Sequence, residues 1–253
     1  MLQRLVIKVG TNVLTRPDGR LDTTNISRLV DDIATLKQAG VQLILISSGA
    51  VGAGRELLPA ADELHSVERR QMLSAIGQVR LMELYRQLFA GHDLLCAQVL
   101  ATKGDFRDEI HYANMLACFR ALLHDQVVPV VNENDVVAVT ELMFTDNDEL
   151  AGLVAQMLKA DALVILSSVD GLFSGPPDNP QSRLIPRVVA DDTSVWAHIA
   201  PEKTSFGRGG MITKIKMAQR TAKEGIRVYL GHGRRDGLLV GLLKEEWYGT
   251  VVF

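Results

Sequence analysis

The sequence has little cysteine, no strong excess of charge and no long hydrophobic run, and each absence excludes a class of protein. Its two cysteines, Cys96 and Cys118, lack the spacing of a metal site and lie in apolar surroundings, which predicts reduced thiols in a reducing compartment. No run approaches the ~18 apolar residues of a membrane span, and the N-terminal stretch lacks the apolar core of a signal peptide. We therefore expect a cytoplasmic protein with no membrane partner.

Charge of one sign is also lacking, because 27 lysines and arginines face 30 aspartates and glutamates, for a formal net charge of −3. Binding to a nucleic-acid backbone needs a basic patch. The basic residues here occur only as scattered pairs such as Arg69-Arg70 and Arg234-Arg235, which we interpret as solvated surface. Nucleic acid is therefore not an expected partner.

Hydrophobic residues make up 47% of the 253 residues, which is enough for a folded core and excludes a disordered tail. Short apolar runs alternate with longer amphipathic ones. The runs predict strands at 5–9, 43–46, 94–100, 127–131, 162–166 and 227–230, and helices at 25–39, 67–89, 112–123, 148–159 and 211–224. This alternation is typical of an α/β fold with a largely parallel sheet, and we expect a single domain over residues 1–253.

Ligands of such folds gather at the carboxyl ends of the strands, so unusual residues there are candidates for a site. The first candidate is Lys8, near the end of an otherwise apolar strand and followed by a turn at Gly10. A buried lysine needs a counter-charge, and the turn offers backbone N–H groups, which together suit a phosphate. The alternative is an edge-strand lysine that reaches water. The segment alone leaves both interpretations open.

The second candidate is the run S-S-G-A-V-G-A-G at 47–54, after the second strand. Its glycines follow the order G-x-x-G-x-G, whereas the dinucleotide fingerprint is G-x-G-x-x-G after the first strand. The phosphate-loop pattern G-x-x-x-x-G-K-[ST] is absent as well. The run therefore indicates an anionic or small polar ligand and makes a nicotinamide-dependent oxidoreductase a poor alternative.

Two dense polar clusters, N-E-N-D and D-N-D, follow the fourth strand and open the next helix. Asp146 is best explained as a helix cap. For Asn134, Asp135, Asn147 and Asp148 we prefer a binding role toward the amino and carboxylate groups of a small substrate, although turn chemistry is the alternative.

A glycine run precedes the helix at 211–224, and Lys214 lies one turn inside that helix. Free N–H groups and the helix dipole make such a start an anion site. With Lys8, this gives two lysines at glycine-rich anion sites and acidic residues between them in sequence. Phosphoryl transfer needs this arrangement, because its transition state spreads negative charge over non-bridging oxygens.

Taken together, K-V-G-T-N, S-S-G-A-V-G-A-G, N-E-N-D, T-D-N-D-E-L, V-D-G-L-F and G-R-G-G-M-I-T-K, in this order, resemble the amino acid kinase family over nearly the whole chain. The resemblance implies a three-layer αβα sandwich with a largely parallel central sheet. The order N-E-N-D, D-N-D, G-G-M-x-T-K favours members that act on glutamate over those that act on acetylglutamate, aspartate or uridylate. It implies that ATP, with Mg²⁺, phosphorylates the side-chain carboxylate of L-glutamate, which starts proline synthesis.

The resemblance also assigns roles to residues of this sequence. Lys8 and Lys214 would neutralise the transferring phosphoryl group, and Asp148 would hold the two lysines in place. Glutamate would be bound by Ser48, Asp135 and Asn147. The nucleotide site would comprise Lys8, Ser167, Ser168, Arg208, Gly209, Gly210, Met211, Ile212, Thr213 and Lys214. ATP oxygens would be the main ligands of Mg²⁺, so no metal-binding side chains are expected. A carboxylate acceptor needs no general base, in agreement with the absence of a clustered Ser, Cys or His.

Two positions depart from the family pattern: Ser168 stands where an acidic residue is common, and Arg208 where a small hydroxyl residue is frequent. Many members carry a further C-terminal domain of the kind found in RNA-modifying enzymes, and we expect this chain to be the kinase domain alone. Family members are typically homo-oligomers, so we expect a dimer or tetramer, with helix 67–89 as an interface or, alternatively, a core helix. Proline is a possible feedback inhibitor.

Two alternatives remain besides the oxidoreductase. One is a kinase of the same fold that acts on another acid or phosphate, such as acetylglutamate or an isoprenoid phosphate. The other is a non-catalytic amino-acid sensor, against which the retention of both Lys8 and Lys214 argues, because a sensor has no transition-state charge to neutralise.

Overall fold

The computed structural model describes residues 2–58, 66–138, 144, 146–199 and 210–253. Its strands are β1 Arg4–Val9, β2 Gln42–Ser47, β3 Cys96–Ala101, β4 Val128–Glu133, β5 Ala162–Ser167, β6 Arg187–Val188, β7 Arg227–His232 and β8 Thr250–Val252. Its α-helices are α1 Thr11–Leu14, α2 Thr23–Gln38, α3 Ala50–Leu57, α4 Ser66–Ala90, α5 Glu109–His124, α6 Asn147–Met157, α7 Met211–Lys223 and α8 Leu238–Gly241. Three 3₁₀ turns are η2 Lys103–Phe106, η4 Ser194–His198 and η5 Leu242–Lys244.

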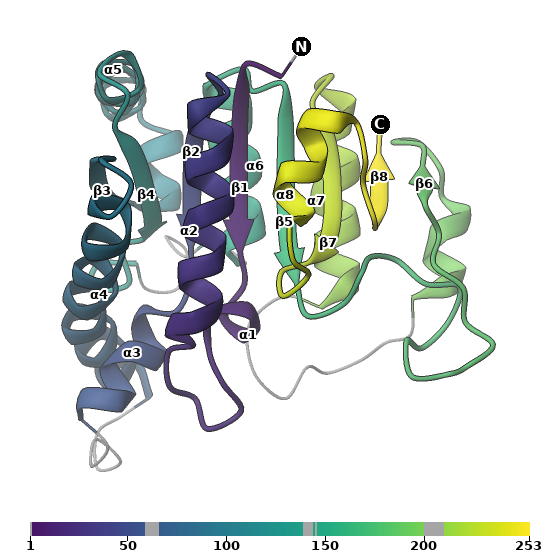
Figure 1. Cartoon of the computed structure of the whole chain (residues 1–253), viewed down its shortest axis with the longest axis horizontal. Coiled ribbons are helices and arrows are strands. Elements are labelled where there is room, and N and C mark those ends of the chain that lie inside the picture. The colour runs from purple at the N-terminus through teal and green to yellow at the C-terminus, as the bar shows by residue number, and fades with distance from the viewer. Residues whose placement is uncertain (1, 59–65, 139–143, 145, 200–209) are drawn as a thin grey trace.

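The strands form one sheet in the order β3-β4-β2-β1-β5-β7-β8-β6 (Figure 1). From β3 to β7 all neighbours run parallel, whereas β8 is antiparallel to β7. In the centre, β1 pairs with β2 on one side and β5 on the other, so Lys8 lies level with Ile46 and Ile165. This central place excludes the interpretation of Lys8 as an edge-strand lysine.

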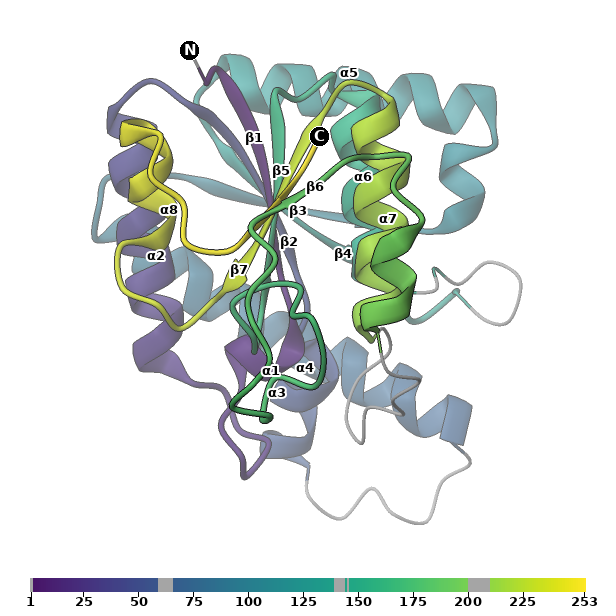
Figure 2. The same cartoon turned by 90° about the vertical axis from the view of Figure 1, so that its right-hand side faces the viewer.

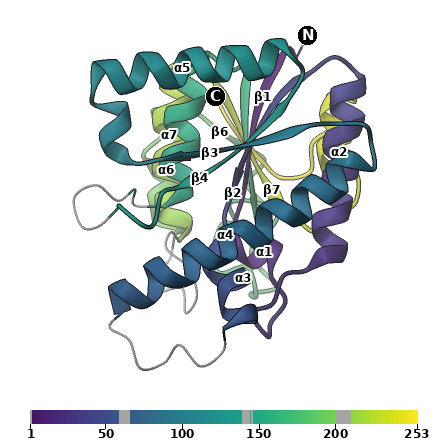
Figure 3. The ribbon, with the colours of Figure 1, turned by 90° about the vertical axis from the view of Figure 1, so that its left-hand side faces the viewer.

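Helices cover both faces of the sheet, which explains why the strands are apolar without alternation. Figure 2 shows α6 and α7 on one face and α2 and α8 on the other, and Figure 3 shows α5 on the side of α6 and α7. Val6 points into a core built with α5, α6 and α7. Its neighbours Leu5 and Ile7 point into a second core with α2, α4 and α8. The predicted three-layer αβα sandwich with a largely parallel sheet is therefore confirmed.

Helix ends follow the local chemistry of the sequence. The carboxylate of Asp22 accepts the N–H of Asn25 at the start of α2, and Gly40 after its end has φ +86°, the left-handed conformation in which helices commonly end. Asp146 accepts the N–H groups of Asp148 and Glu149 and so begins α6, which confirms its capping role. Within the described ranges, no helix combines the length and the apolar character needed to cross a bilayer.

Helix α3 was not predicted, because glycine in a helix interior costs about 1 kcal/mol relative to alanine. Its stability comes from close packing on α4. A Cβ on Gly54 would lie 2.0 Å from the carbonyl oxygen of Leu73, and a Cβ on Gly77 would lie 1.8 Å from that of Ala50. Part of the glycine run therefore serves helix packing and not a ligand, which corrects our interpretation of Gly54. Gly49, with φ +102°, is needed for the turn into α3.

Candidate active site

The strand ends lead into a cleft of about 1370 Å³ on the lower edge of the sheet in Figure 1. Most of the predicted site residues line it: Lys8, Ser48, Asp135, Asn147, Ser167, Ser168, Gly210, Met211, Ile212, Thr213 and Lys214. Arg208 and Gly209 lie outside the described residues. The fold thus brings residues from four strand ends and two helix starts to one place.

Two lysines converge on Asp148. The Nζ of Lys8 lies 2.6 Å from one carboxylate oxygen of Asp148, and the Nζ of Lys214 lies 2.9 Å from the other. Asp148 is fully buried and Lys8 is only 4% exposed. Burial alone would raise the pKa of Asp148, but the two ammonium groups outweigh it and hold that pKa below its ordinary value. Among the described residues the lysines line the cleft and Asp148 lies behind them.

Local structure explains how these three groups meet. Lys8 stands one residue before the end of the central strand β1, and Asp148 is the second residue of α6. Lys214 lies in the first turn of α7, and that helix begins directly after Gly210. Gly210 has no side chain with which to cap α7, and no side chain of the described residues caps it instead, so the first N–H groups of that helix suit an anion in the cleft.

Asn147 joins the cleft to a chain of side-chain amides. Its Nδ2 donates to Ser48 Oγ at 2.9 Å and to Asn132 Oδ1 at 3.0 Å. Asn132 Oδ1 also accepts the backbone N–H of Glu133 at 2.9 Å, and a backbone N–H can only donate. The orientation of Asn132 is therefore fixed, and with it that of Asn147. Among the described residues, neither the carbonyl oxygen of Asn147 nor the hydroxyl proton of Ser48 has a hydrogen-bond partner, so both can serve a ligand in the cleft.

Asn132 is a residue to which sequence reasoning gave no role of its own, although it stands in the N-E-N-D cluster. Asn134, to which we gave a binding role, does not line the cleft as the described residues define it. Its backbone instead organises the turn, since its N–H donates to Ala101 O and its carbonyl accepts from Ala138. Asn134 lies directly after the last residue of β4, Glu133, where the chain turns.

Asp135 is held by α4. Its Oδ1 contacts the guanidinium of Arg70, and its Oδ2 accepts the hydroxyl of Ser74 at 2.8 Å. The same Arg70 nitrogen lies 3.3 Å from Glu133 Oε2. The prediction that the pair Arg69-Arg70 is solvated surface is wrong for Arg70, whose side chain is 29% exposed and paired. Arg70 and Ser74 stand four residues apart on one helix face, so both reach the same carboxylate.

Asp146 both caps α6 and lines the cleft. One oxygen caps α6, as described above, while Oδ2 is buried and has no hydrogen-bond partner among the described residues. Burial, and then the charge of Asp148, raise the pKa of Asp146. Because Asp146 also lines the cleft, it presents a carboxylate there that capping chemistry alone did not predict.

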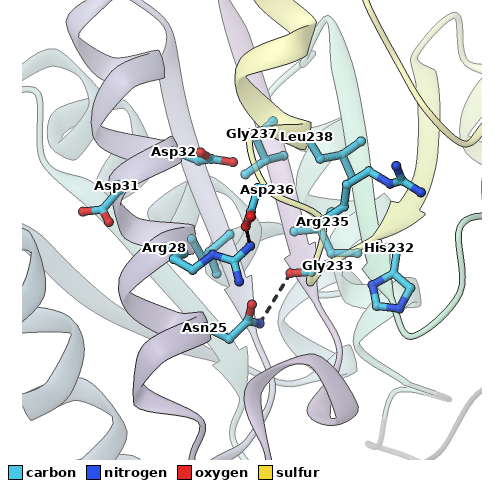
Figure 4. Close-up of a pocket in the computed structure, with 13 residues that line it drawn as sticks. Asn25, Arg28, Asp31, Asp32, His232, Gly233, Arg235, Asp236, Gly237 and Leu238 are labelled. Carbon is cyan, nitrogen blue, oxygen red and sulfur yellow. Dashed lines mark hydrogen bonds and ion pairs between the residues drawn. The ribbon is translucent and has the colours of Figure 1, made fainter.

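A second, smaller pocket of about 220 Å³ lies between α2 and the segment after β7 (Figure 4). None of the predicted site residues that the structure describes lines it. Its arginines are paired within the chain, Arg28 with Asp236 and Arg235 with Asp170 at 3.0 Å. We interpret this pocket as a structural joint between α2 and the β7–α8 connection.

Solved structures with a similar fold include several kinases. A carbamate kinase from Giardia lamblia bound to AMP-PNP superimposes with a TM-score of 0.71 at 18% identity, covering 99% of this chain and 98% of that one. An isopentenyl phosphate kinase from T. acidophilum, in a product complex, also gives 0.71, at 16% identity and with 99% and 100% coverage. At these identities the likeness concerns the fold alone.

Sequence relatives are closer. Glutamate 5-kinase of Bacteroides thetaiotaomicron is 48% identical over 242 residues, which cover 96% of this chain and 67% of the relative. Glutamate 5-kinase of Chlorobaculum tepidum is 49% identical over 249 residues, covering 98% of this chain and 68% of the relative. Residues 3–232 match the model of the amino acid kinase family. With this match and these relatives, the chain belongs to the amino acid kinase family.

Proposed function

We propose that the protein is a kinase that transfers the γ-phosphate of ATP to the side-chain carboxylate of L-glutamate, which gives L-glutamyl 5-phosphate and starts proline synthesis. The observation that carries this proposal is that the ammonium groups of Lys8 and Lys214 both contact the buried carboxylate of Asp148, next to the first turn of α7. The relatives named glutamate 5-kinase support glutamate as the acceptor.

In this proposal the acceptor is already a nucleophile. A carboxylate oxygen of glutamate forms a bond to the γ-phosphorus while the bond from that phosphorus to the bridging oxygen breaks, and ADP leaves. No proton is transferred, so no general base is needed. Lys8 and Lys214 neutralise the charge that spreads over the non-bridging oxygens, and Asp148 keeps both ammonium groups in place before the substrates arrive.

Glutamate is proposed to bind at Ser48, Asp135 and Asn147. The carboxylate of Asp135 and the carbonyl oxygen of Asn147 suit an ammonium group, because both are acceptors. Ser48 suits the α-carboxylate, since its oxygen already accepts from Asn147 and its proton remains to be donated. The donor hydroxyl of Ser48 thus matches the α-carboxylate of an amino acid, and the acceptor oxygens of Asp135 and Asn147 match its α-ammonium group.

The nucleotide is proposed to bind across Ser167, Ser168 and the start of α7, with Gly210, Met211, Ile212 and Thr213, and with Arg208 and Gly209 from outside the described residues. Among the described residues, no group of three or more His, Cys, Asp or Glu side chains is placed to hold a metal ion. We therefore propose that Mg²⁺ arrives with the nucleotide, whose phosphate charge it would offset. The single domain over 1–253, the homo-oligomer with α4 as an interface, inhibition by proline and the cytoplasmic location stay predictions.

The test is an ATP-dependent assay in which hydroxylamine traps the acyl phosphate, run with glutamate and acetylglutamate, with ADP release followed for an isoprenoid phosphate. Glutamate should give hydroxamate. Hydroxamate with acetylglutamate but not glutamate would refute the proposal, and glutamate binding without ADP formation would favour the sensor. We expect Lys8→Ala and Lys214→Ala to lower turnover by about 100-fold or more, by analogy with removal of other transition-state donors. Lys223→Ala, an exposed position on α7, is the control. Near-normal turnover in either variant would exclude the role assigned to that lysine.

A further inference from the structure

Two buried carboxylates stand side by side at the end of β4. Glu133 is 6% exposed and Asp135 is 8% exposed. Both contact the guanidinium of Arg70, which reaches them from the first turns of α4. Two like charges in a buried site repel each other, so a cation that contacts both carboxylates stabilises their arrangement.

The charged surroundings of this pair come from three elements. Arg70 faces both carboxylates from α4, and Glu149 of α6 adds a further negative charge near Glu133. Burial, followed by the charges of Asp135 and Glu149, raises the pKa of Glu133, while the N–H of Phe144 and the charge of Arg70 act in the opposite direction. Without Arg70, the balance would shift further toward protonation of Glu133.

The position of Arg70 is tied to that of Ser48 by helix packing. Helix α3 begins directly after Ser48 and Gly49, and it contacts α4 so closely that Gly54 and Gly77 leave no room for a Cβ. Arg70 and Ser74 belong to that same α4 and hold both oxygens of Asp135. The α3–α4 pair therefore sets the separation between a hydroxyl donor at one end and a carboxylate at the other.

We propose that Arg70 is a positioning residue for recognition of the substrate's free α-ammonium group: together with Ser74, it holds the carboxylate of Asp135 in place at the cleft. The proposal rests on the proposed function, because it takes glutamate as the ligand of Asp135. The carboxylate oxygens of Asp135 accept hydrogen bonds from a free ammonium group and offer much less to an N-acylated amine, which is neutral. Arg70 thereby contributes to the choice of α-amino acids with an unmodified amino group.

The test compares Arg70→Met and Arg70→Lys with the wild-type chain. Removing one partner of a buried charge pair costs several kcal/mol, and Arg70 is partly exposed, so we expect the KM for glutamate in Arg70→Met to rise about 10- to 100-fold. The kcat at saturating glutamate and the KM for ATP should change less than about threefold, since a uniform binding loss raises KM alone. Arg70→Lys should recover part of the loss, because lysine keeps the charge without the guanidinium fork.

Glutarate, which is glutamate without the α-amino group, separates this role from a purely structural one. In Arg70→Met the affinity for glutamate should fall about 10- to 100-fold while the affinity for glutarate changes less than about threefold, because only glutamate places an ammonium group at Asp135. Arg80→Met, at an exposed position of the same helix, is the control and should match the wild type. Circular dichroism confirms that each variant is folded.

An unchanged KM in Arg70→Met, or an equal loss of affinity for glutamate and glutarate, would overturn the proposal. Calorimetric titration with glutamate tests the role of Arg70 separately from the proposed kinase function, because binding can be measured without turnover. If the wild type binds glutamate but makes no hydroxamate, the kinase function fails, and weaker binding by Arg70→Met still supports the role of Arg70. If the wild type does not bind glutamate at all, both proposals fail.

Discussion

Replacing Asp148 with asparagine would remove the carboxylate on which both lysines converge while keeping the shape of the side chain. Asp148 is fully buried, and Lys8 beside it is 4% exposed. Removing one partner of a buried ion pair leaves an uncompensated charge and costs about 3–5 kcal/mol. We therefore expect Asp148→Asn to lower the free energy of unfolding by about 3–5 kcal/mol at pH 7, together with most of the turnover.

The pH dependence of this effect has a definite sign. Lys8 and Lys214 hold the pKa of Asp148 below its ordinary value in the folded chain, against the effect of burial. A carboxyl group with a lowered folded pKa contributes stability that is present above its unfolded pKa and is lost as pH falls through the folded pKa. The difference between wild type and Asp148→Asn should thus be complete at pH 7 and shrink below about pH 4.

Urea denaturation followed by circular dichroism measures the difference, with two comparison variants. Asp31→Asn breaks an exposed pair with His92 and should cost less than about 1 kcal/mol. Lys8→Met leaves Asp148 paired with Lys214, so it should cost less than Asp148→Asn. If Asp148→Asn unfolded at the same urea concentration as Asp31→Asn, the argument from buried charge would be wrong.

Replacing Gly54 with alanine would place a methyl group 2.0 Å from the backbone oxygen of Leu73, so we expect a loss of about 2–4 kcal/mol in thermal or urea unfolding. Gly52→Ala in the same helix meets its nearest atom at 3.3 Å and should cost less than about 1 kcal/mol; equal losses would contradict the packing argument. Asn132→Ala removes an acceptor of the Asn147 amide and should raise the KM for glutamate about tenfold, whereas Asn132→Asp keeps that acceptor and should cost less. If Asn132→Asp raised the KM for glutamate more than Asn132→Ala, the charge at this position, and not the orientation of the Asn147 amide, would determine glutamate binding.

The fold was largely predictable because its elements have strong local patterns. The apolar run of β1 and the amphipathic period of α2 differ clearly, and the observed ends of these two elements lie within two residues of the expected ones. Helix α3 escaped prediction because its glycines oppose a helix locally and are explained only by contact with α4. The place of Lys8 in the sheet also needed the structure, since strand order depends on pairings between distant segments.

The site was predictable where chemistry follows a strand end or a glycine run. Lys8, Asn147 and Lys214 stand at such points and do line the cleft. Arg70 gave no such signal, because it stands within a long helix next to another arginine and looks like surface. Its contact with Asp135 arises from the direction in which α4 crosses the sheet, which only tertiary packing decides.

The central place of β1 also determines how the chain can be divided. One of the two neighbours of β1 in the sheet, β5, begins only at Ala162, more than 150 residues further along the chain. Until that segment is available, one edge of β1 exposes unpaired backbone groups to any other strand in solution. A fragment that stops before β5 would contain Ser48, Asp135 and Asn147 but would keep this open edge. Because of this open edge, we expect such a fragment to aggregate and not to fold as a separate soluble unit.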